Sequence, residues 1–111
     1  MLSLRHRLLR SEIEDVMKHG KALKGSLLSL KYKEGSGKKP KFAVVVSKKV
    51  SNSAVKRNKV KRRVREVVRV LVKDGRVKGL SCVVITNRDI LDKSVDEILE
   101  DLSAVLNRVV A

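Results

Sequence analysis

Aromatic residues are almost absent from this chain of 111 residues, which has one tyrosine (Tyr32), one phenylalanine (Phe42) and no tryptophan. Proteins that hold single-stranded nucleic acid mainly by stacking its bases need several exposed rings. The composition therefore counts against that class of protein. Binding through phosphate charge and backbone shape needs no ring and is not excluded.

Cysteine and long apolar runs are also scarce. The single cysteine, Cys82, cannot form an internal disulfide, which is typical of proteins of the reducing cytoplasm. No apolar run approaches the roughly 18 residues that span a bilayer, and the N-terminus lacks the apolar stretch of a signal peptide. Because domains have about 100–200 residues, we expect residues 1–111 to form one cytoplasmic domain without a membrane partner.

The chain is rich in positive charge, with 27 Lys and Arg residues against 12 Asp and Glu residues and a net charge of +15. Twelve of the basic residues lie between positions 48 and 76, whereas residues 89–101 hold six acidic residues and one lysine. Such segregation indicates one face for a polyanion and another for water.

Hydrophobic periodicity predicts three helices. Ser11 and Glu14 form a capping pattern at the start of the first helix, which Gly20 is expected to end in a left-handed conformation. The second helix covers residues 53–74, and the third begins at a similar capping pattern after Ser94. The second helix carries an apolar stripe formed by Val60, Val64, Val67, Val68 and Leu71.

Short strands are predicted at residues 21–23, 27–33, 41–47 and 80–86. The run 41–47 is almost entirely apolar, which is typical of a central strand that is buried on both faces. The segment 34–41 contains the only proline and is expected to be a hairpin loop. The order of elements predicts an α+β domain with helices packed on a small sheet.

No cluster of reactive side chains points to catalysis or metal binding. Cys82 lies within an apolar strand, where a thiol packs as a small hydrophobic group with a raised pKa. His6 and His19 have no carboxylates or thiols nearby in the sequence that would complete a metal site. We therefore predict no catalytic residue, no metal held by the protein and no small-molecule substrate.

The run from Lys56 to Arg65 is the most informative segment. Cations occupy the sides of the helix away from the valine stripe, and only Glu66 relieves their mutual repulsion. Like charges at helical spacing are destabilising, so this run predicts a binding site for a polyanion rather than an ordinary solvated face.

Residues 47–50, the pair Ala54-Val55 and the run from Lys56 to Glu66 together resemble the signature of the bacterial ribonuclease P protein component. The flanking segments match that family in order and spacing. The resemblance implies the element order α-β-β-β-α-β-α, similar to a domain of a small-subunit ribosomal protein, with a left-handed βαβ crossover. It also implies an RNA-contacting surface made of Lys48, Lys49, Lys56, Arg57, Asn58, Lys59, Lys61, Arg62 and Arg65.

The family resemblance further implies that the catalyst is a large RNA, which binds most of the Mg²⁺ cofactor. The protein would assist removal of the 5′ leader from precursor tRNA without being catalytic alone. The family's leader cleft, between the first helix and the sheet, usually has phenylalanines where this chain has Ile13 and Met17. Tyr32 is the only ring expected nearby, and Lys49 and Arg88 are the expected cations.

Two other functions would also explain a basic helix on a small α+β domain. A ribosomal or ribosome-assembly protein of the same fold would also bind RNA through a basic helix. A DNA-binding regulator would place that helix in a major groove, but cations on several sides of the helix suit phosphate surfaces better than base-edge readout.

Overall fold

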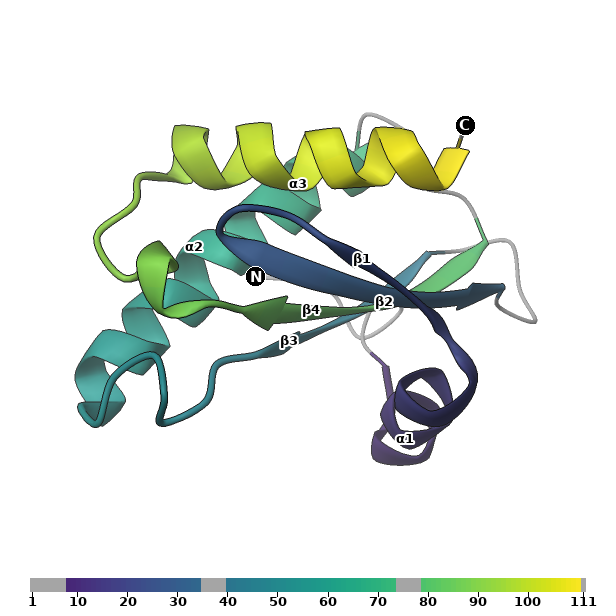
Figure 1. Ribbon diagram of the computed structural model, residues 1–111, viewed down its shortest axis with the longest axis horizontal. Helices are drawn as coiled ribbons and strands as arrows, with labels where there is room; N and C mark the ends of the chain where they lie inside the picture. Colours follow the sequence, from purple (N-terminus) through teal and green to yellow (C-terminus); the bar gives the residue numbers. More distant parts are fainter. Residues whose placement is uncertain (1–7, 35–39, 74–78, 111) are drawn as a thin grey trace.

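The structure, a computed structural model, describes residues 8–34, 40–73 and 79–110 (Figure 1). One helix lies on one face of a four-stranded sheet and two helices lie on the other. This arrangement confirms the predicted α+β class and element order. The elements are α1 (Arg10–His19), β1 (Lys21–Lys24), β2 (Leu28–Glu34), β3 (Lys41–Val45), α2 (Ala54–Lys73), β4 (Leu80–Thr86), the 3₁₀ helix η2 (Arg88–Ile90) and α3 (Val95–Val110).

The two long helices begin as their sequences predict. The Ser53 hydroxyl accepts a hydrogen bond from the Lys56 backbone N–H at the start of α2. At the start of α3, Ser94 and Glu97 exchange hydrogen bonds of 2.9 and 3.3 Å, which is a capping box. All five members of the predicted valine and leucine stripe of α2 are buried. No helix in the described ranges is both long and apolar enough to cross a bilayer.

The predicted ends of α1 are wrong in two respects. The helix begins earlier, because the Glu12 carboxylate, not Glu14, accepts the Leu9 backbone N–H at 3.0 Å. Gly20 ends the helix with φ −76°, which is not left-handed. Glycine is required there for space, since a Cβ atom would lie 2.8 Å from the Tyr32 carbonyl oxygen and would also collide with the Val16 carbonyl oxygen.

The strand order is β1-β2-β4-β3, with β3 and β4 parallel and the other pairs antiparallel. The prediction that residues 41–47 form a central strand is therefore wrong, because β3 lies at the edge and β4 is central. The apolar run is explained by helices on both sides: Phe42 packs in the α2–α3 core, and Ala43 packs on the α1 side. The Leu8 backbone N–H also donates to the Phe42 carbonyl oxygen.

The connection from β2 to β3 is not a hairpin. Glu34 pairs with Leu80 and Lys41 pairs with Ser81, so β4 lies between the two strands that this connection joins. Residues 35–39 themselves lie outside the described residues. The β3–α2–β4 segment is the parallel unit to which the family resemblance assigns a left-handed crossover.

Side chains of each strand alternate between the two faces of the sheet. On β2, Leu28 and Leu30 are buried in the core shared with α2 and α3, and Tyr32 packs against the same core. Cys82 is buried in this core, and desolvation raises the pKa of its thiol to about 12, as expected for an inert thiol. A smaller cluster around Val83 fills the space between the other face and α1.

The acidic segment is more than a solvated face. The Asp101 carboxylate of α3 accepts hydrogen bonds of 2.9 and 3.0 Å from the backbone N–H groups of Ser26 and Leu27. These bonds hold the turn between β1 and β2 against α3. The carboxylate thus satisfies two turn donors that the strands leave unpaired.

Candidate nucleic-acid interface

The predicted RNA-contacting side chains of α2 lie on its outer sides. Arg62 and Asn58 follow one outward stripe, and Lys61 and Arg65 are half-buried beside it. Within the described ranges, none of these side chains makes a hydrogen bond or an ion pair, and the same holds for Lys56 and Lys59. An array of unpaired cations is what phosphate groups of a polyanion would neutralise.

Two arginines of the same helix also have structural partners. One Arg57 guanidinium nitrogen donates to the Ser51 carbonyl oxygen at 2.9 Å, which fixes the loop before α2. Arg63 donates to the carbonyl oxygens of Leu91 and Lys93 at 3.2 and 3.3 Å, linking α2 to the segment before α3. The role of Arg63 was not predicted, because nothing in a basic run distinguishes an arginine that faces a neighbouring loop.

Only one cation of this helix is neutralised by an acidic side chain in the part of the chain that the structure describes. Arg69 pairs with Glu66 one turn earlier, and this hydrogen bond holds the pKa of the Glu66 carboxyl below its ordinary value. The pair lies toward the C-terminal half of α2, so the N-terminal half keeps its full positive charge.

The predicted cations outside α2 gather near its start. Lys48 and Lys49 are exposed in the turn after β3. The Arg88 side chain, which follows β4, donates to the Lys49 carbonyl oxygen at 3.0 Å. Because Arg57 fixes Ser51 in the same loop, this turn and the first turn of α2 form one continuous basic surface.

The structure does not bring together all the residues predicted for the leader cleft. Ile13 is half-buried against the small cluster around Val83, as are Ala43 and Ile85, and Met17 is 38% exposed one turn later. Val45, on the same side of β3 as Ala43, is 37% exposed. We call Ile13, Met17, Val45 and Ile85 the α1 strip, an apolar and partly exposed surface on the α1 side of the sheet.

Tyr32 does not belong to the α1 strip, contrary to the prediction. It packs against the core of α2 and α3, on the opposite face of the sheet from Ile13. The period of two along β2 explains this placement, because Tyr32 has the same parity as the buried Leu28 and Leu30. Lys31 instead faces α1, and its ammonium donates to the Met17 carbonyl oxygen at 3.1 Å.

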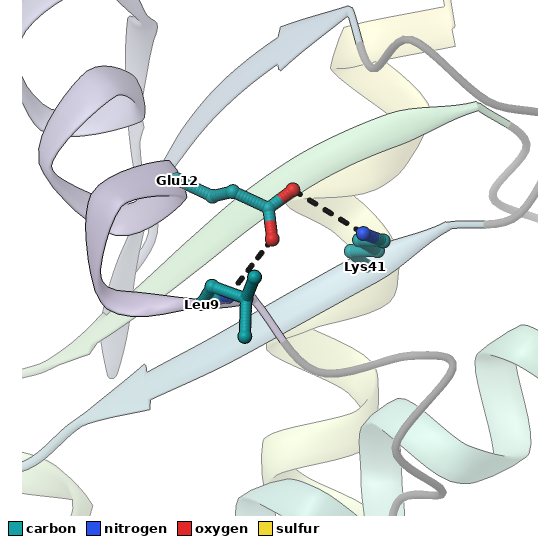
Figure 2. A network of polar contacts seen from close by, with 3 residues as sticks. All are labelled: Leu9, Glu12 and Lys41. Atoms are coloured by element: carbon teal, nitrogen blue, oxygen red, sulfur yellow. Dashed lines mark hydrogen bonds and ion pairs between the residues drawn. The ribbon is translucent and has the colours of Figure 1, made fainter.

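Ion pairs fix α1 against the sheet. Figure 2 shows the Glu12 carboxylate between the Leu9 backbone N–H, at 3.0 Å, and the Lys41 ammonium of β3, at 3.3 Å. Farther along the helix, Asp15 binds the Lys33 ammonium of β2 at 2.6 Å. The Leu9 hydrogen bond, assisted by Lys41, lowers the pKa of Glu12 against the opposing effect of burial, and Lys33 lowers the pKa of Asp15.

These two carboxylates predict that acid weakens the attachment of α1. A carboxyl whose pKa is lower in the folded state stabilises the fold fully above its unfolded pKa, and this stabilisation is lost as the pH falls through the folded pKa. We therefore expect the melting temperature to decrease when the pH is lowered below about 4.5, which is the ordinary pKa of a glutamate such as Glu12. Glu12→Gln should make this decrease of the melting temperature smaller. Glu14→Gln, at an exposed position, is the control; an equal effect of both substitutions would contradict the assignment.

Residues suited to bind a metal do not cluster. In the ranges 8–34, 40–73 and 79–110, no three His, Cys, Asp or Glu side chains come together. His19 is exposed at the end of α1, and His6 lies outside these ranges.

Comparisons with known proteins identify the family to which the chain is similar. The family model described as Ribonuclease P matches residues 2–110. The chain is 44% identical over 64 residues to the ribonuclease P protein component of Paramagnetospirillum magneticum, covering 58% of this chain and 47% of the relative. It is 33% identical over 69 residues to that of Rickettsia peacockii, covering 60% and 58%. The matches thus span about half the length of these relatives.

Solved structures match over nearly the whole chain. The ribonuclease P protein of Thermotoga maritima is 28% identical, with a TM-score of 0.81, over 92% of this chain and 96% of that one. The protein of Staphylococcus aureus has a TM-score of 0.81 at 23% identity over 94% of both chains, which supports the fold alone. Since the family model spans almost the entire sequence, the chain belongs to the ribonuclease P protein family.

Proposed function

We propose that the chain is the protein subunit of ribonuclease P, acting in the cytoplasm. Its partners would be the catalytic RNA and precursor tRNA, and the RNA would bind most of the Mg²⁺. The observation that carries this proposal is the array of unpaired cations on α2 in a chain of this family. The protein would lower the repulsion between two RNAs and so strengthen substrate binding.

The side chains of α2 would contact the catalytic RNA. Arg62 and Arg65 can each bind a phosphate through two parallel hydrogen bonds, whereas Lys59 and Lys61 act as point charges. Asn58 can both donate and accept, so it suits a base edge or a ribose hydroxyl. Lys48 and Lys49 would extend this contact along the adjoining turn.

The 5′ leader would lie along the α1 strip toward Lys49 and Arg88. Ile13 and Met17 can pack against bases and sugars, but they cannot stack as rings do, so the two cations would supply much of the attraction. Hydrolysis would leave a 5′-phosphate on the mature tRNA and a 3′-hydroxyl on the leader. The reacting groups would belong to RNA and metal, and the protein would hold the strands in position.

Reconstitution tests this proposal directly. Added to a bacterial ribonuclease P RNA at limiting Mg²⁺, the protein should restore cleavage of precursor tRNA, and the protein alone should be inactive.

Shortening the leader to one or two nucleotides should reduce the protein's contribution to substrate affinity. Ile13→Phe and Met17→Phe should raise the affinity for a long leader, with mature tRNA as the unchanged control.

Three results would contradict the proposal. Cleavage by protein freed of RNA would show that the protein is itself catalytic. Binding to ribosomal RNA but not to ribonuclease P RNA would favour a ribosomal or ribosome-assembly protein. An unchanged dependence on leader length, with loss of stability in both phenylalanine variants, would show that the α1 strip is core and that the leader lies elsewhere.

A further inference from the structure

A hollow of about 360 Å³ surrounds Tyr32 at the end of the sheet where β2 ends and β4 begins. It lies near the C-terminal end of α3, whereas α2 begins at the opposite end of the molecule (Figure 1). Its apolar side is formed by Tyr32, Leu80 and Val109, and its polar side includes His19, Lys21 and Glu34. We call it the Tyr32 hollow.

The strand register fixes the arrangement of its side chains. Lys21 is paired with Tyr32 across β1 and β2, so their Cβ atoms lie about 5 Å apart. Glu34 lies two residues beyond Tyr32 on the same face and is paired with Leu80 of β4. The hollow therefore has a ring with a cation on one side and a carboxylate on another.

Three polar groups of the hollow have no partner among the residues that the structure describes. Lys21, Glu34 and the Tyr32 hydroxyl make no hydrogen bond or ion pair with any residue of the described ranges. Lys33 differs, because it faces the α1 side and is neutralised by Asp15. Tyr32 is also the chain's only aromatic residue outside the fully buried core, since Phe42 is 1% exposed.

We propose that the Tyr32 hollow binds one unpaired guanine nucleotide of an RNA strand. The inference rests on the proposed function in one respect, that the chain binds RNA. The base lies against the Tyr32 ring with Leu80 and Val109 beside it, as unpaired bases lie on aromatic side chains elsewhere. Lys21 and His19 face the phosphate.

The carboxylate of Glu34 accounts for the choice of base. A carboxylate repels phosphate and accepts hydrogen bonds only, so it favours a base edge with donors. Guanine presents two adjacent donors, its ring N–H and its amino group, which fit the two oxygens of one carboxylate. Uracil presents a single donor between two carbonyl oxygens, and adenine presents only its amino group.

The hollow is separate from the surface assigned to the catalytic RNA. It adjoins Leu80 at the start of β4, whereas Arg88 and the basic turn follow the end of that seven-residue strand, about 20 Å away. A nucleotide here would belong to a different segment of RNA from the one bound by α2. The fold thereby assigns Tyr32 a role on the face opposite the α1 strip.

The composition supplies a direct readout, because Tyr32 is the only tyrosine. Its ring signals in NMR spectra should shift saturably on titration with 5′-GMP, less with 5′-AMP or 5′-UMP, and little with inorganic phosphate. Tyr32→Leu should weaken binding of 5′-GMP, measured by calorimetry, roughly 5- to 150-fold, the loss of one base–aromatic stack. Glu34→Gln, at an exposed position, should remove the preference for guanine without affecting the fold.

A matched variant separates this site from the basic helix. In an Arg62→Ala/Arg65→Ala protein the ring shift with 5′-GMP should persist, whereas assembly with ribonuclease P RNA should weaken. Absence of a ring shift, equal shifts with all nucleotides, an unchanged guanine preference in Glu34→Gln, or loss of the shift in the arginine variant would each overturn the proposal and leave the function of α2 intact.

Discussion

Val64→Asp is expected to unfold the protein. Val64 is fully buried on the inner face of α2, in the core shared with the sheet and α3. A carboxylate there would lose its hydration without gaining a partner, which costs several kcal/mol in addition to the lost apolar burial. A domain of this kind is stable by only about 5–15 kcal/mol. Circular dichroism should show loss of helix at room temperature.

The controls for this prediction are a milder change at the same site and a change one residue further along the helix. Val64→Ala removes only two methyl groups and should cost about 2 kcal/mol, leaving a folded protein. Arg65→Asp places the same new charge on the outer side of the helix and should leave the fold intact. If Val64→Asp stayed folded while Arg65→Asp unfolded, the orientation of α2 would be wrong.

Arg62→Ala and Arg65→Ala are each expected to weaken assembly with ribonuclease P RNA about tenfold or more. A hydrogen bond to a charged group contributes about 1.5–3 kcal/mol, and these guanidinium groups have no partner in the described residues. Neither side chain belongs to the buried stripe, so the melting temperature should change little. Affinity is measured by filter binding and stability by thermal unfolding.

Salt dependence distinguishes lost phosphate contacts from a general effect of charge. Each lost contact should reduce the slope of log affinity against log salt by about 0.7–0.9. Lys18→Ala removes one positive charge from an exposed position on α1 and should leave that slope nearly unchanged. An affinity of the unsubstituted protein that did not vary with salt would contradict binding through phosphate charge.

Local patterns in the sequence determined the two long helices and the outward placement of the α2 cations. The stripe from Val60 to Leu71 has a single helical phase, so burying it forces the intervening cations outward. The caps at Ser53 and Ser94 use contacts within three residues, which a sequence displays directly. The family resemblance likewise followed from one local segment of the sequence, residues 47–66, and the family model then matched residues 2–110.

Only the tertiary structure decided the features that depend on neighbours distant in the sequence. An apolar strand covered by helices on both faces looks the same at an edge as in the centre, so β3 was misplaced. Position 20 requires glycine because the Tyr32 carbonyl oxygen comes close to it, and Arg63 has a structural role because the loop before α3 accepts its hydrogen bonds. The spacing of Leu28, Leu30 and Tyr32 already indicated that the tyrosine shares a face of the sheet with the two leucines. Which face α1 covers, however, is determined by packing across the whole sheet.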